Sequence, residues 1–236
     1  DVSVDNDSAT LLGINYEDLG LGGTIAVNGA GGADTLSALG TADSDLLEVS
    51  FTGADAIDIA LTSSLGSHIN LTSSAVENYS IDGRDGDDNI NISRVSGTQL
   101  VDASGTFDVF GGANGSGSDT LFLEGVATTV ESVLVIPDGA NPDDQDITGL
   151  GTQIDVNGIE VIRYIGADTN DTLTVNPGDG DNDVRVASTH PVGWDGVSSD
   201  SLPVIEFGAL QNFVVDATSQ GSDVVTFKTW FLQGAL

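Results

Sequence analysis

The chain has 236 residues with no Cys and no Met, and 37 acidic residues against five Lys and Arg give it a formal net charge of −32. So few bases exclude a nucleic-acid-binding protein and a polybasic contact with anionic lipid, because both need clustered Lys and Arg. The absence of Cys excludes disulfides, thiol catalysis and zinc sites built on Cys. No apolar run approaches the ~20 residues of a membrane-spanning helix.

The acidic residues are mostly aspartates, with 30 Asp against 7 Glu, and they accompany 31 Gly. Asp and Gly favour turns over helix interiors. A hydrophobic fraction of 39 % is too high for a disordered chain. We therefore expect a folded, β-rich and extracellular protein whose charge is balanced by a metal. The chain begins at Asp1 with neither Met nor a leader, which favours a processed chain or an excerpt of a longer one.

A unit of strand, Gly/Asp-rich turn, Asp and second strand recurs along the chain. Its copies span residues 24–36, 77–92, 107–123, 160–175 and 213–227. The Asp that ends each turn is followed two positions later by an apolar residue, and the spacings between these Asp are 54, 31, 52 and 52 residues. The five turn aspartates are Asp34, Asp88, Asp119, Asp171 and Asp223.

Other segments support the same interpretation. Alternating apolar residues at 57–61 and 184–186 predict half-buried strands. An apolar residue followed by Glu or Gln also recurs, and we place it in the strand before each turn, at Val76-Glu77, Val130-Glu131, Ile159-Glu160 and Leu210-Gln211. Only residues 43–49 favour a single helical turn.

This repetition predicts an all-β protein, a single parallel β-helix or β-solenoid of about eight coils over residues 1–236. Repeated strand–turn units cannot bury their apolar face alone, but stacked units share one core. With ~4.8 Å between strands, the rod would be roughly 40 Å long. The alternative is two tandem antiparallel β-sandwich domains, with residues 137–142 as the linker.

Two of the turns resemble a known family. Gly29-Ala-Gly-Gly-Ala-Asp34-Thr-Leu36 and Gly83-Arg-Asp-Gly-Asp-Asp88-Asn-Ile90 are similar to the nonapeptide of RTX (haemolysin-type) calcium-binding proteins. The wider unit over residues 76–90 resembles repeats of large bacterial surface proteins and adhesins. The resemblance implies a β-solenoid in which turn Asp and Gly carbonyls bind Ca²⁺. Because the motifs here are isolated and Ala30 and Arg84 replace the second Gly, it implies separate sites and not a continuous ladder.

Clusters of Asp within single turns extend the candidate calcium ligands. Ca²⁺ takes six to eight oxygen ligands, and closely spaced Asp in a Gly-rich turn can supply several. The alternative is a solvated acidic surface without bound metal. The candidate ligands are Asp34, Asp85, Asp87, Asp88, Asp119, Asp171, Asp179, Asp181, Asp183 and Asp223.

We expect a non-enzymatic structural protein, a calcium-supported subunit or segment of a bacterial surface filament, surface layer or adhesin. The apolar run over residues 224–236 predicts end-to-end association with another copy or a neighbouring domain, unless it folds back as an internal last strand. The alternative is a polysaccharide-active β-helix enzyme or its carbohydrate-binding module. That alternative requires a groove in which carboxylates meet Arg163, Arg185 or Trp194, and Trp194 either stacks on a sugar or anchors its loop.

Overall fold

The computed structural model describes residues 2–5, 23–64, 66, 68–95, 97–138, 144–168, 170–188, 194–200, 202–217 and 221–228. These residues form strands, turns and bends but no helix, which confirms the all-β prediction. In these ranges no helix is long and apolar enough to cross a membrane.

The described strands form three sheets. Sheet A has the spatial order β1 (Val2–Asp5), β2 (Thr24–Asn28), β6 (His68–Ser74), β5 (Ala56–Ser63), β4 (Asp45–Gly53), β9 (Asn89–Arg94), β12 (Thr120–Glu124), β16 (Val161–Ile165), β20 (Val204–Gly208), β19 (Asp195–Ser198), β18 (Asp183–Ser188) and β22 (Val224–Lys228). Sheet B has the order β21 (Asn212–Val215), β17 (Thr172–Val175), β13 (Ser132–Pro137), β14 (Gln145–Thr148), β15 (Ile154–Asn157), β10 (Phe107–Phe110), β7 (Asn78–Asp82) and β3 (Thr35–Leu39). Sheet C pairs β11 (Ala113–Asn114) with β8 (Asp85–Gly86).

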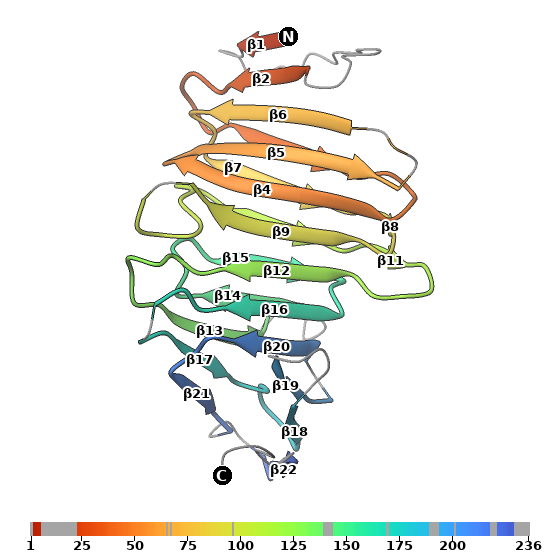
Figure 1. The fold of residues 1–236 in the computed structure, drawn as a ribbon, viewed down its shortest axis with the longest axis vertical. Coiled ribbons are helices and arrows are strands. Elements are labelled where there is room, and N and C mark those ends of the chain that lie inside the picture. Colours follow the sequence, from red (N-terminus) through yellow and green to blue (C-terminus); the bar gives the residue numbers. More distant parts are fainter. Residues whose placement is uncertain are drawn as a thin grey trace, which may run out of the picture.

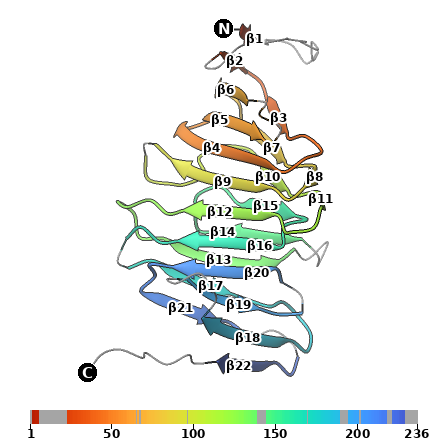
Figure 2. The same ribbon diagram turned by 45° about the vertical axis from the view of Figure 1, so that its right-hand side comes forward.

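The chain passes repeatedly from one sheet to the other. Strands β7, β8 and β9 lie in sheets B, C and A, and the next pass places β10, β11 and β12 in the same three sheets. Corresponding strands of the two passes pair in parallel. Successive passes therefore stack along the long axis, with the N-terminal strands at one end and β22 at the other (Figures 1 and 2).

Three meanders interrupt this parallel stacking, so the two large sheets are mixed. In β4–β5–β6, β13–β14–β15 and β18–β19–β20 the middle strand is antiparallel to both of its neighbours. The helical turn expected at residues 43–49 was wrong, because these residues enter β4. In β4 the alternating residues Leu47, Val49 and Phe51 are all buried, which is the period of a strand.

The core lies between the inner faces of sheets A and B. In sheet A, Leu47, Ile90 and Leu121 occupy matching positions on neighbouring strands, and none of them is exposed. Phe51 contacts two aromatic residues of sheet B, Tyr79 and Phe107, at ring centroid distances of 6.0 and 5.4 Å. Apolar residues of successive passes thus form continuous rows that each pass alone could not bury.

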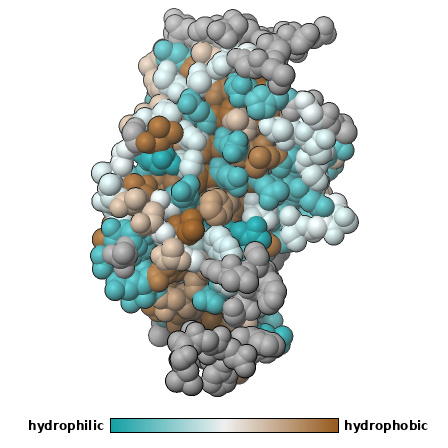
Figure 3. Space-filling view, viewed as in Figure 1, coloured by the Kyte–Doolittle hydropathy of each residue, from teal (hydrophilic) through white to brown (hydrophobic). Residues whose placement is uncertain are grey.

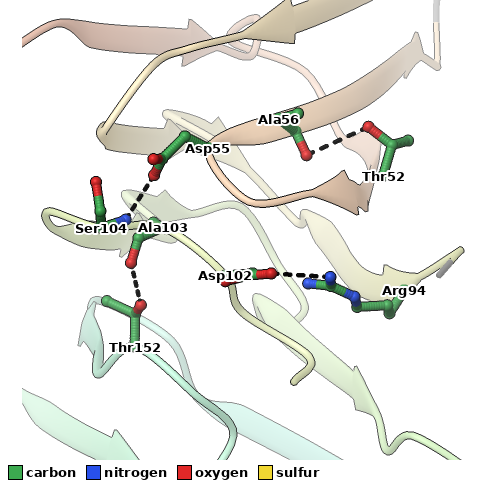
Figure 4. A network of polar contacts seen from close by, with 8 residues as sticks. All are labelled: Thr52, Asp55, Ala56, Arg94, Asp102, Ala103, Ser104 and Thr152. Atoms are coloured by element: carbon green, nitrogen blue, oxygen red, sulfur yellow. Dashed lines mark hydrogen bonds and ion pairs between the residues drawn. The ribbon is translucent and has the colours of Figure 1, made fainter. Parts of the chain in front are cut away.

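Polar contacts join the chain connections beside β4, β9 and β14 (Figure 4). The Asp55 carboxylate accepts a hydrogen bond from the Ser104 N–H at 2.6 Å, and Thr152 donates its hydroxyl to the Ala103 carbonyl. Arg94, whose side chain is only 5 % exposed, pairs with Asp102 at 2.9 Å. These contacts hold the connections of three successive layers together.

Two segments singled out in the sequence lie at turns or edges of the sheets. Pro137 ends β13, which pairs antiparallel with β14, and residues 139–143 lie outside the described residues. Sheet B continues across this turn, because β15 pairs with β10. At the other end, β22 pairs in parallel with β18, and residues 229–236 lie outside the described residues.

Candidate functional site

An acidic residue stands directly before many of the strands, where the chain turns from one sheet into the next. We call these residues the corner acids. In sheet A, Asp88, Asp119, Glu160 and Asp223 directly precede strands and Asp45 is the first residue of β4. Those before strands of sheet B are Asp34, Glu77, Glu131 and Asp171. All five turn aspartates of the sequence repeat belong to this set.

Corner acids of neighbouring strands are joined by hydrogen bonds between backbone and side chain. The N–H of Asp45 donates to Asp88 Oδ1 at 2.7 Å, the N–H of Asp88 donates to Asp119 Oδ1 at 2.7 Å, and the N–H of Asp119 donates to Glu160 Oε2 at 2.8 Å. Each carboxylate thus accepts a backbone donor that the turn leaves without a strand partner. A column of four linked acids results along one corner of the molecule.

The same arrangement recurs at the other corners. The N–H of Asp34 donates to Glu77 Oε2 at 2.9 Å, and the N–H of Glu131 donates to Asp171 Oδ1 at 2.8 Å. Near the C-terminal end, the N–H of Asn182 donates to Asp223 Oδ1 at 3.0 Å. The repeat Asp therefore do not form one column: Asp88 and Asp119 are linked to each other, while the others belong to separate corners.

The glutamates of the repeat lie one residue outside the strands in which the sequence places them. Glu77 and Glu160 do not lie in the strand before a turn, but directly before β7 and β16. Their turns are short and pass through a left-handed residue, Ala75 (φ 53°) or Gly158 (φ 65°). We infer that the longer Glu side chain compensates for the shorter turn. The available signal was the apolar residue two positions after the acid, which both Glu share with the repeat Asp.

The second carboxylate oxygen is buried at several corners. Asp88 and Asp119 are fully buried, and the Oδ2 atom of each has no hydrogen-bond partner. Each Oδ2 lies against the glycine that directly follows β7 or β10, because a Cβ on Gly83 would be 2.4 Å from Asp88 Oδ2. On Gly111 a Cβ would be 2.9 Å from Asp119 Oδ2. Glycine and acid thus form one packed corner.

Burial and neighbouring negative charges raise the pKa of these carboxyls. Burial, together with the negative charges of Asp119, Asp45 and Asp87, raises the pKa of Asp88 to about 7, although the N–H of Asp45 opposes the rise. Burial and the charge of Glu160 raise the pKa of Asp119 to about 6. Asp88 and Asp119 therefore keep their protons to a higher pH than an ordinary Asp does.

At a related corner, a tyrosine hydroxyl donates a hydrogen bond to the buried carboxylate. Glu131 is buried, and its Oε2 accepts a hydrogen bond of 2.6 Å from the hydroxyl of Tyr164, while its Oε1 accepts the N–H of Val126 at 3.0 Å. Burial raises the pKa of Glu131, and the two hydrogen bonds oppose the rise. The same burial, with the neighbouring carboxylate, raises the pKa of Tyr164.

The remaining candidate calcium ligands lie in two exposed turns. Asp85 is exposed in β8, and Asp87 Oδ1 accepts the N–H groups of Gly115 and Gly117, both at 2.9 Å. In the second turn, Asp179 is exposed.

The other two members of the second turn have protein partners. The Oδ1 atom of Asp181 accepts the N–H of Ser222 at 2.7 Å, and Asp183 pairs with Arg185 at 2.9 Å. The structure therefore brings Asp85, Asp87 and Asp88 to one turn and Asp181, Asp183 and Asp223 near another, but several of these carboxylates already serve as hydrogen-bond acceptors.

A row of carboxylates outside the set of candidate calcium ligands crosses the outer face of sheet B. Asp108, Asp155 and Asp146 occupy matching positions on β10, β15 and β14. They line a hollow of about 140 Å³ together with Phe110 and Asn157. Burial and the charge of Asp155 raise the pKa of Asp108, and burial with Asp138 and Asp155 raises that of Asp146. Only strand pairing brings these residues together, so sequence spacing held no signal for them.

Neither set of carboxylates is a ready-made metal centre. Among the described residues, no group of three or more His, Cys, Asp or Glu is arranged so that it could hold a metal ion. A calcium ion would need side chains to turn toward it. The calcium prediction stays a prediction.

No family model, curated protein or solved structure matches this chain.

Proposed function

We propose that this protein is a non-enzymatic β-solenoid segment of an extracellular filament, surface layer or adhesin. Its task is to form a stiff acidic rod, and its mechanism is the stacking of successive passes of the chain. The proposed extracellular location follows from the acidic, Asp- and Gly-rich, Cys-free composition and from the resemblance to RTX-type repeats.

The column of corner acids is the observation that carries this proposal. The carboxylates of Asp88, Asp119 and Glu160 accept backbone N–H groups from the neighbouring layer, and that of Asp45 accepts the N–H of Thr41 in its own turn. A typical intramolecular hydrogen bond contributes about 0.5–1.5 kcal/mol. Such acids serve stiffness and alignment between the layers.

Calcium belongs to the proposal as a counter-ion. The row of Asp108, Asp155 and Asp146 is the place that needs least rearrangement, because neighbouring strands already set these carboxylates side by side. A ligand bound only by the folded state stabilises it by RT ln(1 + [L]/Kd), about 2.7 kcal/mol at 100 Kd.

Electron microscopy and analytical ultracentrifugation of the 236-residue chain test the structural function. We expect elongated particles that associate end to end as the protein concentration rises, with β-type circular dichroism. Compact particles that stay monomeric at every concentration would overturn the assembly proposal.

Thermal unfolding with calcium or with chelator tests the counter-ion separately. We expect Ca²⁺ to raise Tm above the value in NaCl of equal ionic strength, and Asp155→Asn to reduce this gain more than Asp179→Asn does. If chelator and Ca²⁺ give the same Tm, the proposed role of calcium is refuted, while the proposed structural role of the rod is not affected.

A polysaccharide-active protein is the second candidate, and one observation favours it. Exposed Glu48, Asp58 and Glu124 line a shallow groove on the outer face of sheet A. Release of reducing ends from a polysaccharide, lost in Glu48→Gln or Asp58→Asn, would favour an enzyme over a structural segment.

A further inference from the structure

The groove on the outer face of sheet A is built from side chains in register. Thr24, Asn70, Ala60, Glu48 and Asn91 form one row across β2, β6, β5, β4 and β9, and Phe122 of β12 continues it. A second row places Thr72, Asp58, Ser50 and Ser93 beside it. The groove therefore runs across the strands, along the long axis of the molecule.

Its shape is open and its lining is polar. The groove has a volume of about 450 Å³. The small side chains of Ala60, Ser50 and Ser93 form the floor in the middle of the groove. The hydroxyls of Ser50 and Ser93 lie 2.9 Å apart. Figure 3, drawn from the side of sheet A, shows hydrophilic side chains among hydrophobic ones over the middle of this face.

Phe122 lines the groove and is paired with a second aromatic ring. The ring of Phe122 meets that of Trp194 edge to face, with centroids 6.2 Å apart and an interplanar angle of 71°. Trp194 precedes β19, so the meander of sheet A brings it to this place. On the next strand, the guanidinium of Arg163 is paired with Glu206 at 2.5 Å.

The charge of the lining selects against anionic chains. Among the residues that the structure describes, neither Lys, Arg nor His lines the groove, whereas three exposed carboxylates do. Nucleic acids, uronates and sulfated glycans would be repelled here. A protein partner also fits poorly, because charged residues are depleted in the centre of protein interfaces. Hydroxyl, carboxamide and carboxylate groups are instead suited to the hydroxyls of a neutral sugar, and an aromatic ring is suited to its apolar face.

We propose that this groove binds a neutral polysaccharide chain lying along the long axis. Glu48 and Asn91 lie on neighbouring strands, at the strand spacing of ~4.8 Å that is close to the length of one sugar ring, and Asn70 lies two strands from Glu48, beyond Ala60. They hydrogen-bond to sugar hydroxyls, and Phe122 packs on a ring at the end of the groove. Binding needs no bond to be cleaved, and it does not depend on whether copies of the rod associate.

Affinity electrophoresis of the whole chain tests the site. The gels contain xyloglucan, galactomannan, dextran or soluble β-1,3-glucan, with alginate as the anionic comparison. We expect at least one neutral polysaccharide to retard the protein and alginate to leave its mobility unchanged. No retardation by any of the four, or stronger retardation by alginate, would overturn the proposal.

Variants then locate the binding. Phe122→Ala should weaken it about tenfold, and Ala60→Trp should block it by filling the groove while removing no contact. Phe110→Ala, on the outer face of sheet B, is the matched control and should bind as the unaltered protein does. Equal weakening by Phe110→Ala, or full binding by Ala60→Trp with an unchanged melting curve, would place the saccharide elsewhere and refute the groove. Particle length by electron microscopy is read independently, so this result and the assembly result can fail separately.

Discussion

At the scale of single residues, the corner acids of this protein serve as acceptors of backbone hydrogen bonds. A corner such as Gly111 and Asp119 combines a glycine with no room for a side chain and a carboxylate that accepts a backbone N–H. An isolated buried carboxylate is costly, so the group holds its proton or recruits a cation.

The first prediction concerns pH. The pKa of Asp88, about 7, and that of Asp119, about 6, lie above the ~3.9 of an unfolded Asp. The folded state therefore binds more protons than the unfolded state between these values. The stability they contribute is fully present below pH ~4 and is lost as pH rises through 6 and 7. We expect the free energy of unfolding to fall by roughly 2–5 kcal/mol from pH 5 to pH 8.

Urea unfolding with chelator, at constant ionic strength, measures the slope of the free energy of unfolding against pH. Asp88→Asn keeps the Oδ1 acceptor but removes the titrating proton, so it should flatten the slope and raise stability at pH 8. Asp179→Asn, at an exposed turn, removes the same charge and serves as the control. Identical slopes in the two variants would show that general charge repulsion, and not the buried column, causes the pH dependence.

The second prediction concerns the glycine of a corner. A Cβ on Gly111 would lie 2.0 Å from the Gly158 carbonyl oxygen, so Gly111→Ala should destabilise the protein by about 1–3 kcal/mol. Gly31 also lies in a turn, but a Cβ there would meet nothing within 4 Å. Gly31→Ala should stay within about 0.5 kcal/mol of the unaltered protein. Chemical unfolding compares the two, and equal effects would contradict the close approach of the layers at Gly111.

At the scale of elements, polar contacts hold the connections between strands in place. The connection after β9 is held by the buried guanidinium of Arg94, which pairs with Asp102 (Figure 4). Neighbouring contacts join this connection to the β4–β5 turn and to Thr152. Such contacts align long connections whose ordering would otherwise cost conformational entropy.

The third prediction follows from this contact. Removing one partner of a buried ion pair leaves the other charge uncompensated, so Arg94→Met should cost roughly 2–5 kcal/mol. Arg185 pairs with Asp183 at the same distance of 2.9 Å, but its side chain is 60 % exposed. Arg185→Met should cost less than about 1 kcal/mol. Thermal and urea unfolding of both variants measure the difference, and an equally small effect at Arg94 would argue against its burial in solution.

At the scale of the whole molecule, the charge of −32 opposes the compact state. The layered architecture offsets this repulsion with continuous apolar rows between sheets A and B. Five Lys and Arg cannot neutralise the surface, so ions of the medium must screen it.

The fourth prediction is a dependence on salt. The Debye length falls from about 30 Å at 0.01 M to about 10 Å at 0.1 M salt. We expect Tm to rise by roughly 5 °C over this range, since 1 kcal/mol corresponds to about 2–4 °C for a chain of this size. Far-UV circular dichroism follows the melting, and a Tm independent of NaCl would mean that the charges are already compensated by bound ions.

Sequence alone determined the all-β class and the turn pattern, because period-2 apolar residues and Gly/Asp turns act locally. It also marked an acid directly before a strand at Asp34, Asp88, Asp119, Asp171 and Asp223. The strand pairing decided the rest. Which corners share a column, how Glu160 continues the series, and how Asp108 meets Asp155 depend on residues about 40 positions apart becoming neighbours. The three meanders shift that register, and a spacing read along one chain cannot contain it.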